Sequence, residues 1–151
     1  MQKFTGENAI SSKEATAFLT IKGQNIDLFY AKALEAKITK NKQEIKALGS
    51  RMTGHKTTSA SGEGTLTIYE VTSAFKEFFL DYVNKGIDYY FNIQVKNEDS
   101  STPYGAETKL LTGANFDEMV IAQFDSDDGI LEQELPFTFE GVELLSKYTS
   151  I

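Results

Sequence analysis

The sequence predicts a mainly β domain of the α+β class, a sandwich or barrel with one amphipathic helix over one side. Several segments alternate apolar and polar residues with the period of a strand, whereas a single stretch has the 3.6-residue spacing of a helix. Hydrophobic residues make up 40% of the 151-residue chain, which is enough for one packed core. We therefore expect a single domain over residues 1–151.

The first third of the chain contains one clear strand and one ambiguous segment. "TAFLTI" at 16–21 predicts a short strand, and "KGQN" at 22–25 predicts a turn. Residues 26–38 alternate with period two, which favours a strand. A helix over 31–48 competes with this interpretation, because its residues are good helix formers and its apolar spacing partly fits a helix. The residues alone leave the two alternatives open.

A long polar segment follows, over residues 49–64. It contains four glycines, a run of Thr and Ser, and three basic or titratable side chains, Arg51, His55 and Lys56. This composition predicts a flexible loop, and loops longer than about 12 residues in a compact domain are usually functional or disordered. "GTLTIYEV" at 64–71 then predicts a strand.

The clearest helix is predicted over residues 73–85. Ser73 can cap its start, Lys85 suits its negative C-terminal end, and Gly86 can end it in a left-handed conformation. An aromatic stripe with this spacing could line a ligand site, but far more often it packs on a sheet. The expected packing face consists of Phe75, Phe78, Phe79, Tyr82 and Val83.

The rest of the chain predicts strands. Residues 88–96 alternate as a strand, 97–105 form a turn, and 107–124 form one long strand or two short ones. Residues 131–141 alternate between apolar and mostly acidic positions. Pro136 falls on the polar face of this segment, which indicates a sheet edge or a bulge.

No recognisable catalytic, cofactor or metal site emerges from the residues. "GSRMTGHKT" at 49–57 resembles a phosphate-binding loop, but His55 displaces the lysine and a flexible tract followed by a strand stands where a helix is required. "DSDDG" at 125–129 resembles a calcium loop, which requires Gly at its sixth position and Glu at its twelfth. Here Gly129 is at the fifth position and Pro136 at the twelfth, which favours a tight acidic turn. With no Cys and one His, we expect no metal, no cofactor and no enzymatic activity.

Charge is distributed unevenly along the chain. Residues 1–97 carry 13 Lys/Arg and 10 Asp/Glu, whereas residues 98–151 carry 2 and 12. Either one side of the domain is simply acidic, or opposite charges meet between copies. The acidic balance argues against wrapping nucleic acid. No apolar run could span a membrane, and the N-terminus lacks a signal-like stretch, so we expect folding in a cytoplasm.

Five stretches, in order, resemble one known family. They are "NAISSKEATAF" (8–18), "KNKQEIKALG" (40–49), "RMTGHKTTSASGEGTLTIYEVTS" (51–73), "DYVNKGIDYYFNIQ" (81–94) and "EQELPFTFEG" (132–141). They are similar to tail tube proteins of contractile-tailed phages and defective prophages of Gram-positive bacteria. The resemblance covers nearly the whole chain, although residues 97–115 match only loosely.

The resemblance implies a structural subunit with the tail-tube type of β fold. Six-membered rings would stack head to tail into a hollow tube inside a contractile sheath, as a conduit for DNA. It also implies a strand at 26–38, followed by a turn and a second strand in "KNKQEIKAL". The implied location is a virion tail or a phage-tail-like particle, after assembly in the host cytoplasm.

The resemblance also implies partners and an assembly loop. The implied partners are further copies of the chain and the sheath, baseplate or tape measure, and tail terminator proteins. DNA would be passing cargo, and a target membrane would be met only by the assembled particle. Alternatives are the tube of a phage-tail-like bacteriocin, which carries no DNA, or a secretion-system ring. The expected inter-subunit loop comprises Arg51, Met52, Thr53, Gly54, His55 and Lys56.

Overall fold

The computed structural model describes residues 5–127 and 129–149, and in these it contains eight strands and one α-helix. Two short 3-10 turns, η1 (Gly6–Asn8) and η2 (Ser12–Glu14), precede the first strand. The helix is α1 (Ala74–Lys85). The strands are β1 (Thr16–Ile21), β2 (Gln24–Asp27), β3 (Ala31–Ile45), β4 (Gly54–Tyr69), β5 (Phe91–Glu98), β6 (Ala106–Phe116), β7 (Glu132–Phe139) and β8 (Gly141–Ser146). The mainly β prediction with a single helix is thereby confirmed.

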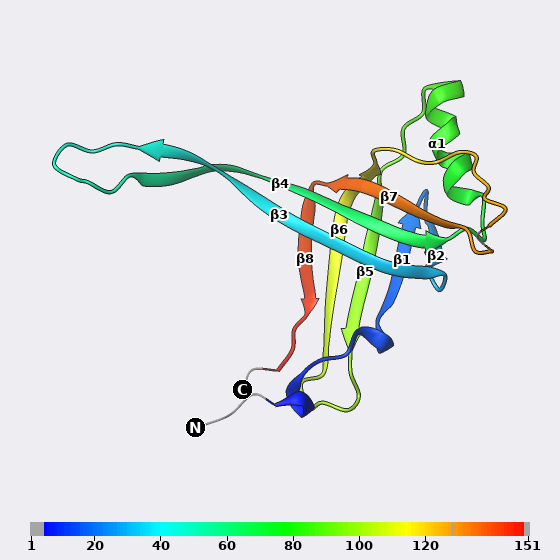
Figure 1. The fold of residues 1–151 in the computed structure, drawn as a ribbon, viewed down its shortest axis with the longest axis horizontal. Helices are drawn as coiled ribbons and strands as arrows, with labels where there is room; N and C mark the ends of the chain where they lie inside the picture. The colour runs from blue at the N-terminus through cyan, green and yellow to red at the C-terminus, as the bar shows by residue number, and fades with distance from the viewer. Residues whose placement is uncertain (1–4, 128, 150–151) are drawn as a thin grey trace.

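All strand pairs are antiparallel, and the order is β2-β1-β5-β6-β7-β4-β3, with β8 paired to β6. Strand β6 links two groups of strands. Its first part pairs with β5 and β8, whereas Asn115 and Phe116 at its end pair with β7. Strands β3, β4 and β7 cross the other group at an angle (Figure 1). The two groups form crossing layers and not a closed barrel.

The core lies where the two layers cross. Leu19 of β1, Ile93 of β5, Leu66 of β4 and Leu135 of β7 are all fully buried in one apolar cluster. The alternation expected for β7 is present, because Leu135, Phe137 and Phe139 point inward and Glu134 and Thr138 outward. Burial of such side chains supplies the main driving force for the fold.

The most prominent feature is a hairpin of β3 and β4 that projects far beyond the body (Figure 1). The two strands pair from Ala31↔Ile68 out to Ile45↔Gly54, so only residues 46–53 form the connection. The strand interpretation is therefore confirmed over a helix for residues 31–38, whereas the single strand predicted over 26–38 is wrong at residues 28–30, where a turn separates β2 from β3. The loop predicted over 49–64 is wrong for residues 54–64, which form β4. "KNKQEI" continues β3 and does not form a turn and a second strand.

Cross-strand pairing explains why a polar segment is a strand. Residues 35–61 are all exposed, so no buried apolar face marks them in the sequence. Within β3 and β4 the backbone groups that face the partner strand are paired, and Asn41 donates a side-chain hydrogen bond of 3.0 Å to Ser59. Lys37 and Glu63 also form an ion pair at 3.6 Å. Local composition cannot reveal this long-range partner.

Smaller differences concern element ends. The turn after β1 is Lys22–Gly23, since Gln24 and Asn25 already belong to β2. Strand β5 begins at Phe91 and not at residue 88, and the segment predicted over 107–124 is one strand that ends at Phe116. Pro136 pairs with Thr65 of β4, and its carbonyl accepts a hydrogen bond from the Asp117 N–H at 2.8 Å on the other side, so the sheet edge or bulge predicted there is wrong. Asp128 of the expected acidic turn lies outside the described residues.

The helix is short. Helix α1 has 12 residues, which is too short to span a bilayer. No helix in the described part of the chain is long and apolar enough to do so. The end of α1 follows the sequence expectation, because Gly86 adopts a φ of 73° and its N–H donates to the Tyr82 carbonyl at 2.9 Å. Its start differs, since the Ser73 hydroxyl makes no capping hydrogen bond, and it is the Thr72 hydroxyl that accepts one, from the Ala74 N–H at 3.2 Å.

Candidate functional site

Helix α1 packs on the body through its N-terminal half. Phe75 is buried, and Phe78 and Phe79 are partly buried. Tyr82 and Val83 are 59% and 64% exposed, respectively, because the second half of the helix extends past the sheet. The structure therefore places only the N-terminal part of the expected face against the core and leaves its C-terminal part open.

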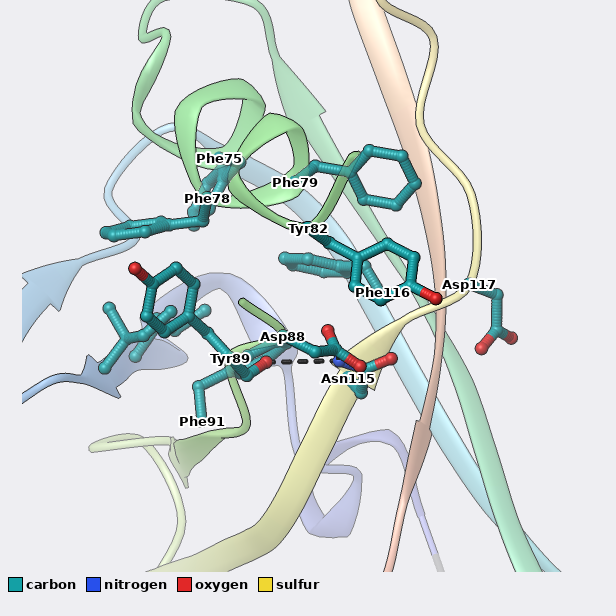
Figure 2. Close-up of a pocket in the computed structure, with 12 residues that line it drawn as sticks. Phe75, Phe78, Phe79, Tyr82, Asp88, Tyr89, Phe91, Asn115, Phe116 and Asp117 are labelled. Carbon is teal, nitrogen blue, oxygen red and sulfur yellow. Dashed lines mark hydrogen bonds between the residues drawn. The ribbon is translucent and has the colours of Figure 1, made fainter. Parts of the chain in front are cut away.

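A cavity of about 370 Å³ lies between this helix and the strands (Figure 2). Its walls are mainly aromatic, and the rings contact one another: Phe78 and Tyr89 lie 5.6 Å apart between centroids, and Phe91 and Phe116 lie 4.6 Å apart. Such a volume is at the lower end of the range for binding pockets in proteins. The lining residues are Leu19, Ile21, Phe75, Phe78, Phe79, Tyr82, Asp88, Tyr89, Phe91, Asn115, Phe116 and Asp117.

Polar groups are few in this cavity and lie toward one side of it. The Asn115 amide donates to the Asp88 carboxylate at 2.8 Å and to the Tyr89 carbonyl at 3.1 Å. Partial desolvation raises the pKa of Asp117, and the nearby carboxylates of Glu118 and Glu63 raise it further. The cavity thus combines an apolar interior with carboxylates in its wall.

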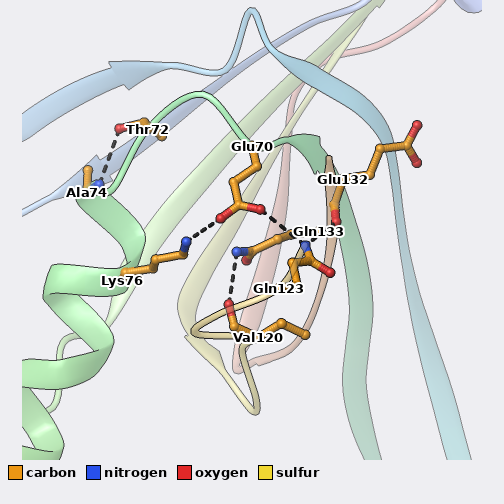
Figure 3. Close-up of polar contacts among 8 residues, drawn as sticks. All are labelled: Glu70, Thr72, Ala74, Lys76, Val120, Gln123, Glu132 and Gln133. Atoms are coloured by element: carbon orange, nitrogen blue, oxygen red, sulfur yellow. Dashed lines mark hydrogen bonds and ion pairs between the residues drawn. The ribbon is translucent and has the colours of Figure 1, made fainter. Parts of the chain in front are cut away.

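The irregular segment between β6 and β7 is tied to α1 by a polar network (Figure 3). Lys76 of α1 pairs with Glu70, and the Gln123 amide donates to the same carboxylate at 3.1 Å. Hydrogen bonding to Lys76, followed by that to Gln123, lowers the pKa of Glu70. Buried Gln133 holds the segment from the other side, since its amide donates to the Val120 carbonyl at 3.0 Å. Segment and helix therefore form one end of the molecule.

This end, which we call the acidic end, comprises α1 and residues 117–134. Residues 117–134 contain seven Asp/Glu and no Lys or Arg. Apolar side chains are also exposed here, and Phe124 is 93% exposed. Exposed apolar groups rimmed by charge are typical of interaction surfaces. The other exposed apolar side chains of the segment are Val120, Ile121, Ile130 and Leu131.

The expected assembly residues lie at the opposite end, around the hairpin tip (Figure 1). Arg51, Met52 and Thr53 belong to the connection, whereas Gly54, His55 and Lys56 begin β4 and pair with Ile45, Glu44 and Gln43. All six are exposed. No carboxylate that the structure describes lies within ion-pair distance of Arg51 or Lys56. The structure does not bring these residues together with the helix face within one chain.

Two strands carry unpaired backbone edges in the layer that contains β1, β5 and β6. Strand β2 pairs only with β1, and β8 pairs only with β6, so they flank the layer on opposite sides. Strand β8 also exposes Val142, Leu144 and Leu145, each between 41% and 53%. Exposed edges of this kind favour pairing with another chain.

Comparison with known proteins agrees with the sequence resemblance. A family model described as "Phage tail tube protein" matches residues 2–146. The chain belongs to the phage tail tube protein family. It is also 45% identical over 141 residues to the phage-like element PBSX protein XkdM of Bacillus subtilis, and the match covers 93% of each chain.

Solved structures share the fold of this tail tube protein. A chain of the anti-feeding prophage baseplate superposes with a TM-score of 0.69 at 13% identity, covering 91% of this chain and 95% of that one. A chain of the sheath/tube terminator of an extracellular contractile injection system gives 0.68 at 12% identity, with 94% and 100% covered. The tail tube protein is therefore a structural subunit by family, with a fold that recurs in contractile particles.

Sequence reasoning missed two features of this tail tube protein. The aromatic cavity is formed by residues distant in the chain, such as Leu19, Tyr89 and Phe116, and no local pattern indicates it. Leu48 is fully exposed at the hairpin tip, and a single leucine within a polar stretch was its only signal. Among the described residues, no group of three or more His, Asp or Glu side chains is arranged to hold a metal ion.

Proposed function

We propose that this tail tube protein forms six-membered rings that stack head to tail into a hollow tube, a conduit for DNA in a contractile tail. The observation that carries the proposal is the polarity of the molecule: a basic hairpin projects from one end, and an acidic surface covers the other (Figure 1). A contact between unlike surfaces repeats from one subunit to the next and builds a filament.

Ring closure would use the unpaired edges of β2 and β8. These edges are on opposite sides of one layer, so the β8 edge of one subunit can pair with the β2 edge of its neighbour. The layer would then continue around the ring and leave no open edge. Six subunits are supported by the shared fold with a chain of the anti-feeding prophage baseplate, which was solved with six-fold symmetry.

Stacking would use the hairpin tip. Arg51, His55 and Lys56 project beyond the body, and none of them forms an ion pair with a carboxylate that the structure describes. We assign their partners to acidic side chains of the next ring. The six residues Arg51–Lys56 would thus act as an inter-subunit segment, in which Arg51–Thr53 belong to the connection and Gly54–Lys56 to β4.

The channel wall would be the face of β1, β5 and β6 that points away from the core. Register places Thr20 beside Asn92 on this face, and Lys96 between Thr16 of β1 and Thr108 of β6. Lys96 is neutralised by Glu98 at 3.1 Å. The same face carries the ring of Phe18, 41% exposed, opposite Gln94. A wall with few unpaired charges, on a protein with a net charge of −7, would not hold DNA phosphates, so DNA could slide past.

Sheath, baseplate or tape measure, and terminator proteins are the proposed partners, and the assembled tail is the proposed location. Negative-stain electron microscopy of the purified protein over a concentration series tests the proposal. Hollow rods, or rings with a central hole, are expected. Small uniform particles at every concentration, with or without the cognate baseplate, would refute it.

A further inference from the structure

We propose that the aromatic cavity beside α1 in one copy receives the hairpin tip of a second copy, with Leu48 as the anchoring side chain. This inference rests on the proposed stacking and adds the acceptor site to it. The chemistry of the tip, the cavity and the charges around each supports the same pairing.

The tip holds Leu48 outward in a defined position. The Ser50 N–H donates to the Ala47 carbonyl at 3.4 Å, and Gly49 has a φ of 82°, so residues 47–50 form a tight turn. The Ser50 hydroxyl then donates to the Met52 carbonyl at 2.9 Å. Leu48 is fully exposed and Met52 is 83% exposed. Two large apolar side chains at the end of an otherwise polar arm gain stability only when another molecule covers them.

The cavity has the complementary character. Its walls are rings from α1 and from β5 and β6, and about 370 Å³ is available between them. Tyr82 lines this space and is itself 59% exposed, so this wall of the cavity is open to solvent. Leucine and methionine side chains provide apolar surface to match these walls without leaving a polar group unpaired.

Charge makes the pairing selective. Residues 40–56 carry five Lys/Arg and one Glu, whereas residues 117–134 beside the cavity carry seven Asp/Glu and no basic residue. Asp88 and Asp117 line the cavity itself. Tip and acidic end therefore attract each other, while two tips or two acidic ends repel.

Geometry makes the contact intermolecular. The hairpin extends away from the body on the side opposite to α1, so a tip cannot reach the cavity of its own chain (Figure 1). A tip-to-cavity contact joins two different surfaces and leaves a free tip and a free cavity at the ends of each pair. The same contact can then repeat along the tube.

Disulfide trapping tests the pairing directly, because the chain has no cysteine of its own. Copies carrying Leu48→Cys are mixed with copies carrying Tyr82→Cys, allowed to assemble, and oxidised. A mixed disulfide dimer is expected, since a bridge forms only when the two Cα atoms approach within about 7 Å. Thr20→Cys, exposed on the other side of β1, is the matched control and should not cross-link to Leu48→Cys.

A second variant pair measures the role of the anchor. Leu48→Asp places a carboxylate against Asp88 and Asp117 and should weaken self-association at least about tenfold in sedimentation, while Leu48→Met should leave it nearly unchanged. If tubes assemble but the disulfide between positions 48 and 82 is no more abundant than the one between positions 48 and 20, this inference is wrong. The proposed function would still stand. Absence of assembly under all conditions, together with absence of the disulfide, would overturn both.

Discussion

Among individual residues, Glu70 has the clearest structural role. It follows the end of β4, pairs with Lys76 of α1 and accepts a hydrogen bond from Gln123 of the segment before β7 (Figure 3). Its side chain is only 14% exposed, so these partners replace water around the carboxylate. One carboxylate thus connects the end of β4 with both parts of the acidic end.

Glu70→Gln should therefore change how stability depends on pH. The pKa of Glu70 is lowered in the folded protein, so its contribution is fully present above the ordinary glutamate pKa of about 4.3 and is lost as pH falls through the folded value. We expect the variant to lose about 1 kcal/mol near neutral pH and to show a shallower loss toward acid. Urea unfolding across this pH range measures both effects.

Glu118→Gln is the control for this experiment, because Glu118 is exposed and belongs to the same acidic segment. It removes the same charge without breaking the network. Equal acid profiles for the two variants would show that overall charge, and not the Glu70 contacts, sets the pH dependence.

At the scale of elements, α1 is held mainly by Phe75. This side chain is 3% exposed and packs against Tyr30 and Phe116, with ring centroids 6.4 Å and 5.6 Å away. Phe75→Ala should destabilise the protein by about 3–5 kcal/mol. Phe78→Ala should cost less, since Phe78 is only partly buried, and Tyr82→Ala less than about 1 kcal/mol. Thermal or urea unfolding of the three variants gives the order, and an equal loss for Tyr82→Ala would contradict the open cavity.

The root of the hairpin depends on a close approach at Gly64. A Cβ atom there would lie 2.4 Å from the Glu35 carbonyl oxygen and 2.7 Å from the Phe137 ring, and the first of these is backbone. Gly64→Ala should therefore cost about 1–3 kcal/mol, because strand or ring must move. Gly54→Ala, on the same strand, meets its nearest atom at 3.6 Å and should be nearly neutral. Urea unfolding midpoints compare the pair, and equal midpoints would refute the packing described.

Elements with a buried face could be predicted from the sequence, and those without one could not. Leu135, Phe137 and Phe139 alternate inward, so β7 was readable, and Phe75 to Gly86 carry both the spacing and the stop of α1. Thr57 to Ser61 are exposed on both faces, so their strand depends on pairing with residues 39–42 and not on any local pattern. The same holds for the candidate site. The composition and the family resemblance point to the tip residues, whereas the cavity is lined by residues far apart in the sequence and is visible only in the folded structure.

For the whole molecule, the separation of surfaces matters most. The hairpin tip, the acidic end and the two unpaired edges of β2 and β8 lie in different places, so ring closure and stacking use different parts of the chain. The net charge of −7 conceals this arrangement, because five of the 15 Lys/Arg lie in residues 40–56. Single substitutions can therefore affect one mode of association and spare the other.

Arg51→Ala with Lys56→Ala should prevent stacking and leave rings intact. Both side chains are exposed, so the subunit should keep its unfolding free energy within about 0.5 kcal/mol. Loss of their attraction to the acidic end should raise the concentration needed for tubes at least about tenfold, or about 1.4 kcal/mol.

Leu144→Asp on β8 is the contrasting change, because it places a charge beside an edge proposed to join neighbours within a ring. Native mass spectrometry should show rings for the double variant and no closed rings for Leu144→Asp, with electron microscopy at the normal assembly concentration showing tubes for neither. If the double variant formed tubes at the normal concentration, the hairpin charges would have no part in stacking, and the acidic end would need another partner.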